Sequence, residues 1–141
     1  MENLILHLPA AGILFLRLML GMLFLFQGYE KVALIGTSKV AETFRYELKK
    51  SFLPDWLFSA TALYSSWVEL IGGALLILGL LKPLAFLFLG VDLILVTAAM
   101  GMMNPLWDLK HVFPRMILLV ILMFIPIAQD VFSIDHLLNL W

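Results

Sequence analysis

Long apolar runs dominate the chain, and short polar segments separate them. A helix that crosses the hydrocarbon core of a bilayer needs about 20 mostly apolar residues. Four runs reach this length, and proline or charged residues interrupt the sequence between them. The pattern therefore predicts four membrane-spanning helices, at about residues 8–32, 57–81, 84–103 and 112–131.

The longest connection, residues 33–56, carries a pattern of its own. Four apolar residues recur in it at a spacing of four: Val40, Phe44, Leu48 and Phe52. Four charged residues lie off this row: Lys39, Glu42, Arg45 and Lys49. Such an amphipathic pattern predicts a helix at about residues 38–52 that lies in the membrane interface. A short solvated helical loop is the alternative interpretation.

Lysine and arginine are distributed unevenly between the two predicted sides of the membrane. One side carries most of them: Lys31, Lys39, Arg45, Lys49, Lys50 and Lys110, with Arg115 just inside. The other side has Lys82. The positive-inside rule then predicts cytoplasmic loops at residues 33–56 and 104–111, and both termini outside. The first run lacks a basic flank and a small-residue cleavage site, so we expect a retained span and not a signal peptide.

Composition supports a membrane class. Hydrophobic residues make up 63% of the 141 positions and charged residues 13%, with a mean hydropathy of +1.04. Soluble domains have roughly 45–50% apolar and about 25% charged residues. A net charge of −1 argues against a nucleic-acid partner. Because the chain has no cysteine, it offers no disulfide, thiolate metal site or iron–sulfur ligand.

Every predicted span contains a buried titratable side chain. They are Arg17, Glu69, Asp92 and Arg115. A charge at membrane depth costs about 2.5–3.5 kcal/mol even on the lenient insertion scale, so such residues usually face the bundle interior and pair with one another. Two cations and two anions are the balance that pairing requires.

Helical phase and depth, counted at about 1.5 Å per residue, sort these residues into two clusters. The deep cluster contains the candidates for a ligand or proton site: Arg17, Gly21, Phe24, Gly28, Glu69 and Asp92. The second polar cluster lies near the cytoplasmic end: Gln27, Glu30, Lys31, His111 and Arg115. We expect Arg17 to be neutralised by Glu69 and Asp92. Each cluster has a second interpretation, in which its charges only lock helices together.

Several kinds of chemistry find no support in the sequence. A membrane haem needs histidines within the spans, whereas His7, His111 and His136 lie at their ends. No carboxylate–histidine group has metal-ligand spacing, and no glycine-rich loop suggests a nucleotide site. The chain has no visible redox centre of its own.

Two motifs resemble the DoxX family of small four-helix bacterial membrane proteins. The first is Arg17-Leu-Met-Leu-Gly21 followed by Phe24-Leu-Phe-Gln-Gly28-Tyr-Glu-Lys31, and the second begins at Glu69-Leu-Ile-Gly-Gly and runs to Lys82. The resemblance implies an all-α, four-helix integral bundle in the bacterial cytoplasmic (inner) membrane. It also implies redox work, because the family is named after a subunit of a thiosulfate:quinone oxidoreductase and other members are linked to oxidative stress. Asp92 and Arg115 lie outside the motifs.

Three functions are compatible with the sequence. The first is an accessory subunit of a quinone-dependent oxidoreductase, in which the deep cluster binds the quinone headgroup or relays its protons. The second is a non-catalytic assembly protein that recruits a lipid, a second copy or a redox or stress-related protein partner through residues 39–52. The third is a small transporter, for which four spans are few and no inverted repeat is visible.

Overall fold

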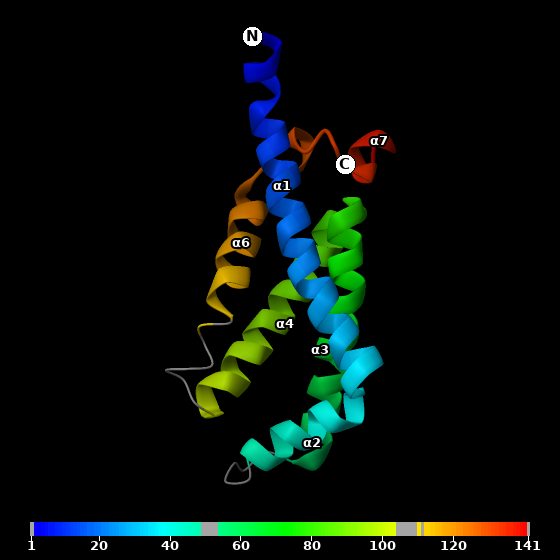
Figure 1. Cartoon of the computed structure of the whole chain (residues 1–141), viewed down its shortest axis with the longest axis vertical. Coiled ribbons are helices and arrows are strands. Elements are labelled where there is room, and N and C mark those ends of the chain that lie inside the picture. Colours follow the sequence, from blue (N-terminus) through cyan, green and yellow to red (C-terminus); the bar gives the residue numbers. More distant parts are fainter. Residues whose placement is uncertain (1, 49–53, 104–109, 111, 141) are drawn as a thin grey trace.

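The computed structural model is all-helical over the residues that it describes, which are 2–48, 54–103, 110 and 112–140 (Figure 1). Its first half contains α1 (Glu2–Tyr29), the π-helical segment η1 (Glu30–Ile35), α2 (Thr37–Glu47) and α3 (Asp55–Leu78). Its second half contains α4 (Lys82–Met103), α6 (Phe113–Phe124), the 3-10 turn η3 (Ile127–Gln129) and α7 (Ile134–Leu137).

Three helices are long and apolar enough to cross a membrane: His7–Ile35, Asp55–Leu78 and Lys82–Met102. The predicted class, an all-α membrane protein, is confirmed at this level. The first helix begins earlier than predicted, at Glu2. The α2 helix ends at Glu47, and residues 49–52 of the predicted amphipathic helix lie outside the described residues.

The fourth apolar run differs from its prediction. The α6 helix has 12 residues and ends at Phe124, so one continuous helix to about residue 131 was wrong. The cause is Pro126, which disfavours helical backbone at the residue before it. Ile125 accordingly adopts φ −80° and ψ 127°, an extended conformation.

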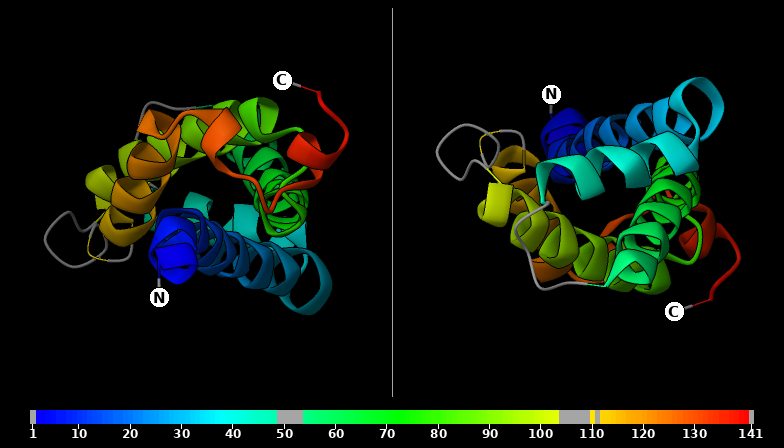
Figure 2. Two further views of the ribbon diagram at one scale, coloured as in Figure 1. Left: turned by 90° about the horizontal axis from the view of Figure 1, so that it is seen from above. Right: turned by 90° about the horizontal axis from the view of Figure 1, so that it is seen from below.

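The α3 helix packs against α1, α2 and α4, and its neighbours α1 and α4 lie on different sides of it (Figure 2). Glycines let α1 and α3 approach closely. A Cβ atom added to Gly28 would run into the backbone of Leu70, and one added to Gly73 would meet the backbone of Leu25. Small residues at a membrane helix interface allow this kind of contact.

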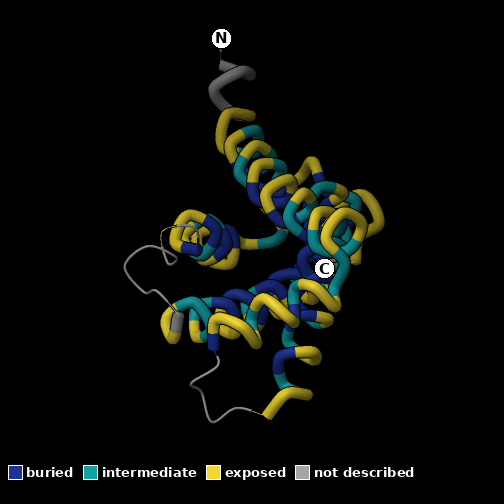
Figure 3. The backbone as a smooth tube through the Cα atoms, turned by 60° about the horizontal axis from the view of Figure 1, so that its bottom comes forward, coloured by how far each residue is buried: buried dark blue, intermediate teal, exposed yellow. Residues whose placement is uncertain are grey.

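Buried and exposed positions alternate along the long helices (Figure 3). Many large apolar side chains are exposed. Leu20, Phe24 and Leu76 are fully buried, whereas Ile94 and Phe124 are 70% and 83% exposed. An apolar outer surface of this extent is typical of a protein whose solvent is lipid. The α2 helix lies at one end of the molecule, and the N-terminus and α7 lie toward the other (Figure 1).

Candidate functional site

The buried charges form two clusters, but their membership differs from the prediction. We call the first the α7-side cluster, which contains Arg17, Lys82, Asp130, Ser133 and Asp135. We call the second the α2-side cluster, which contains Gln27, Lys31, Ser65, Glu69 and Arg115. Asp92 is buried beside the second cluster.

Arg17 is the centre of the α7-side cluster and is 1% exposed. Its Nη1 donates to the carbonyl oxygens of Leu76 at 2.5 Å and Ile77 at 2.7 Å, and its Nη2 donates to Phe132 O at 2.9 Å. Its Nε lies 3.1 Å from Asp130 Oδ2. The last carbonyls of a helix have no intrahelical partner, so this guanidinium satisfies the end of α3.

The C-terminal segment completes the α7-side cluster. Lys82 Nζ lies 3.0 Å from Asp130 Oδ2 and donates to Ser133 Oγ at 2.9 Å. The Asp135 carboxylate accepts hydrogen bonds from the backbone N–H groups of Leu81 and Lys82 at 2.7 and 2.9 Å. A carboxylate at this position caps the start of α4.

The expected pairing of Arg17 with Glu69 and Asp92 was therefore wrong. Its carboxylate partner is Asp130, which the sequence places at the end of a predicted helix. The break at Pro126 folds the following residues over the end of the bundle and brings Asp130 to Arg17. The contacts of this cluster join the C-terminal segment to α1, α3 and α4, which is a structural role.

Glu69 is the centre of the α2-side cluster and is fully buried. Its Oε2 lies 2.6 Å from Lys31 Nζ, and its Oε1 lies 3.3 Å from Arg115 Nη1. Arg115 Nη1 also donates to Gln27 Oε1, and Lys31 Nζ donates to Ser65 Oγ at 3.0 Å. One carboxylate of α3 thus holds cations from two other elements.

A cavity of about 260 Å³ adjoins the α2-side cluster. Its polar lining consists of Gln27, Glu30, Lys31, Thr43, Glu69 and Arg115. Its apolar lining consists of Ile35, Val40, Phe44, Val96 and Met100. Residues of α2 belong to both sets, so α2 forms one wall of the cavity.

Asp92 is fully buried on α4. Neither of its carboxylate oxygens has a close hydrogen-bond partner among the described residues, and the Ser65 hydroxyl is the side-chain hydrogen-bonding group that acts on it. Ser65 and Glu69 on α3, Lys31 on η1 and Arg115 on α6 are the polar and charged groups that act on it. The group therefore has charges near it but no direct ion pair of its own in the described part of the chain.

The structure redistributes the predicted site residues. Gln27, Glu30, Lys31 and Arg115 lie together around the cavity, as the second cluster predicted, and Glu69 joins them. His111 lies outside the described residues. Of the other candidates, Gly21 and Gly28 lie against α3, and the Phe24 ring lies 5.8 Å from Arg115 Cζ.

Sequence reasoning missed Ser65 as a direct partner of Lys31, and it missed Thr43 and Phe44 as cavity wall. Ser65 lies four residues before Glu69 and therefore on the same face of the helix, and this spacing was the available signal. Nothing in the sequence indicated how far α2 folds back over the bundle. Within the described residues, no group of three or more histidine, aspartate or glutamate side chains has the geometry to hold a metal ion.

Comparison with known proteins gives one match. The family model described as DoxX matches residues 12–102. No curated protein and no solved structure matches the chain.

Proposed function

The chain belongs to the DoxX family, and on that premise we propose that it is a membrane subunit associated with quinone-linked redox chemistry. The observation that carries the proposal is the α2-side cavity, where Lys31 and Arg115 converge on the buried Glu69. A binding site in a membrane protein needs a few polar groups in an apolar surround, and this cavity has both.

The lining of the cavity fits a quinone headgroup. The ammonium of Lys31 carries three donors, and within the described residues two of them reach Glu69 and Ser65. A third is available to an acceptor oxygen in the cavity, while Phe44, Val96 and Met100 offer apolar contacts to a ring. Lys31 lies in the π-helical η1, and π-helical turns occur often at functional sites.

A bound quinone would supply the redox chemistry that the described side chains lack. The chain's own contribution is to bind and orient the headgroup and to move protons. We propose that Asp92 stores a proton and exchanges it with the cavity through Ser65, whose hydroxyl accepts from Lys31 at 3.0 Å. Ionisable groups inside a membrane commonly serve proton relays. Electrons would arrive from a partner protein.

The test is extraction of the purified protein and mass spectrometry for isoprenoid quinones. We expect a quinone in the wild type and its loss in Lys31→Met and Glu69→Gln, with folding checked by thermal unfolding. Arg45→Gln is the control, because Arg45 pairs at the surface with Asp55 at 3.2 Å and does not adjoin Glu69. Wild-type protein that contains no quinone, from membranes rich in it, would overturn the proposal.

A second candidate is a non-catalytic assembly protein. It is supported by the α7-side cluster, where Arg17 has a structural role, and by the exposed side of α2, where Tyr46 is 67% exposed. In this case a redox or stress-related protein partner, a lipid or a second copy would bind at α2. Substitution of Tyr46 would then release the partner, while Glu69→Gln would change only stability.

We also propose how the chain crosses the membrane and which side each loop faces. The α6 helix spans about 18 Å at 1.5 Å per residue, and with η3 it completes a fourth crossing of a four-helix bundle. The α2 helix lies in the cytoplasmic interface of a bacterial inner membrane, with both termini outside. Because the chain has no cysteine, Ser38→Cys and Asn139→Cys test this with an impermeant maleimide on spheroplasts. Labelling of the cysteine at position 38, and not of the one at position 139, would show that the orientation is the reverse of the proposed one.

A further inference from the structure

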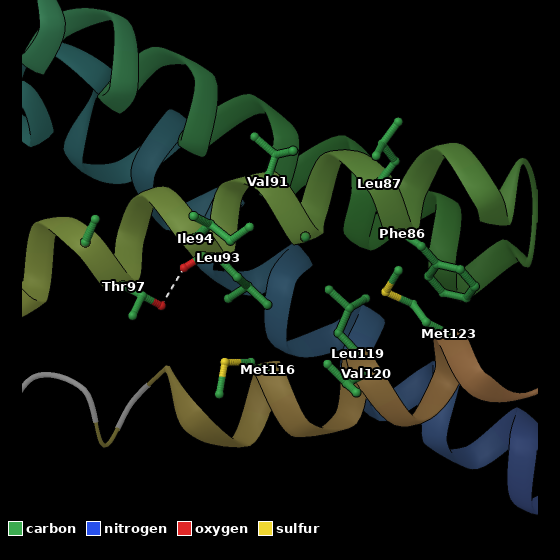
Figure 4. A pocket seen from close by; sticks show the side chains of 12 residues that line it. Phe86, Leu87, Val91, Leu93, Ile94, Thr97, Met116, Leu119, Val120 and Met123 are labelled. Carbon is green, nitrogen blue, oxygen red and sulfur yellow. Dashed lines mark hydrogen bonds between the residues drawn. The ribbon is translucent and has the colours of Figure 1, made fainter.

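An apolar groove of about 610 Å³ runs between α4 and α6 (Figure 4). Buried Leu93 and Leu119 contribute to it from facing helices, and exposed residues such as Ile94 and Val120 form its outer edge. The side-chain hydroxyl of Thr97 is directed to its own helix, where it donates to Leu93 O at 2.6 Å. The groove therefore offers hydrocarbon surface to a ligand.

Gly90 keeps the groove open. A Cβ atom added at this position would have a single neighbour within 4 Å, Leu119 Cδ2 at 4.0 Å. The other helix-interface glycines behave differently, because a Cβ atom at Gly28 or Gly73 would collide with backbone. Close packing therefore explains Gly28 and Gly73 but not Gly90, whose missing side chain leaves space.

The groove adjoins the α2-side cavity on both of its helices. On α4, Val96 lines the cavity and the next residue, Thr97, lines the groove. On α6, Arg115 lines the cavity and the next residue, Met116, lines the groove. A molecule with its polar head at Arg115 would therefore reach the groove across these neighbouring positions.

We infer that the α4–α6 groove holds the single long hydrocarbon tail of an amphiphile whose polar head lies in the α2-side cavity. The inference rests on the proposed function, and it adds a tail site to the headgroup site. The α4 backbone rises about 16 Å between Phe86 and Thr97, which is about half of a hydrocarbon core of roughly 30 Å. A chain along the bundle fits this length.

Two probes separate the headgroup site from the tail site: the tail-less ubiquinone headgroup and its decyl derivative, each titrated against protein in nanodiscs. Tails gain only packing energy when they move from lipid to a helix groove, so we expect the decyl derivative to bind about tenfold more tightly. Gly90→Leu fills the groove and should abolish this gain without changing affinity for the tail-less probe. Gly101→Leu, on the same helix and in open space, should keep the gain.

Each outcome of the titration decides one point. Equal affinity for the two probes in the wild type, or an undiminished gain in Gly90→Leu, overturns the tail site and leaves the proposed function standing. Binding of neither probe overturns the proposed function and the tail site with it. If Gly90→Leu changes the oligomeric state but not the decyl gain, a second copy occupies the groove and the inference is wrong.

Discussion

Glu69 and Asp92 provide a matched test of how the α2-side cluster is built. Both carboxylates are fully buried, and Glu69→Gln and Asp92→Asn both replace a carboxylate with an amide of the same shape. Glu69 lies within 2.6 Å of Lys31 and 3.3 Å of Arg115. Asp92 has no ion pair and no close hydrogen-bond partner among the described residues, and Ser65 is its hydrogen-bonding neighbour. We expect unequal costs in unfolding free energy from the same chemical change.

The magnitudes follow from these contacts. Removing one partner of a buried ion pair costs about 3–5 kcal/mol, since a charge remains without its partner. For Glu69→Gln we expect about 3 kcal/mol, the lower end of that range, because the Lys31 side chain is 19% exposed and can reach water. For Asp92→Asn we expect less than about 1 kcal/mol, because a buried carboxylate without a partner is costly in its charged form and the amide is neutral.

The assay is equilibrium unfolding in mixed micelles, followed by tryptophan fluorescence and far-ultraviolet circular dichroism. The free energies of unfolding of the two variants are compared with that of the wild type under identical conditions. Equal costs for the two substitutions would refute this account of the cluster, and so would a neutral Glu69→Gln. A large cost for Asp92→Asn alone would show that Asp92, and not Glu69, balances the cations.

Three further substitutions test the packing. Gly79→Ala should destabilise the folded protein by about 1–3 kcal/mol, because Gly79 has a φ of 66° and the added Cβ atom would lie 2.7 Å from the guanidinium nitrogen of Arg17. Gly36→Ala is the control, because Gly36 has a φ of 87° but lies in open space. It should cost less in the same unfolding assay. Gly28→Ala should separate α1 from α3 and lower the thermal midpoint, whereas Gly12→Ala, with nothing within 4 Å, should leave the midpoint unchanged. Asp130→Asn should weaken the contacts that hold the C-terminal segment, because the buried cations Arg17 and Lys82 both pair with this carboxylate. The expected signal is faster backbone hydrogen exchange in residues 127–140. Unchanged exchange would contradict this prediction.

The sequence predicted the helical membrane class because hydrophobicity adds up over each long apolar run of the chain. Each long apolar run must satisfy its backbone hydrogen bonds internally when lipid is the solvent, and a helix does so. The same logic placed Arg17, Glu69, Asp92 and Arg115 toward the interior, and the structure buries all four of them. Local pattern was sufficient for both conclusions.

The partners of the charges needed the tertiary structure. Depth along separate helices gave Arg17 two candidate acids, and both were wrong because Asp130 reaches it from a segment beyond a proline break. A depth count assumes straight, continuous spans, and the helix that begins at Phe113 ends at Phe124. One local break therefore reassigned the partners of an entire cluster.

The sequence alone determined the membrane class, the helical class and the three long apolar helices up to their ends. It also determined that buried charges must pair, since all of these depend on residue composition and spacing. Only the tertiary structure decided that Glu69 pairs with Lys31 and Arg115, that Asp92 has no ion pair in the described part of the chain, and that a groove adjoins the cavity. Pairing and cavities depend on distances of a few ångströms between segments far apart in the chain, and those distances follow from how the helices pack.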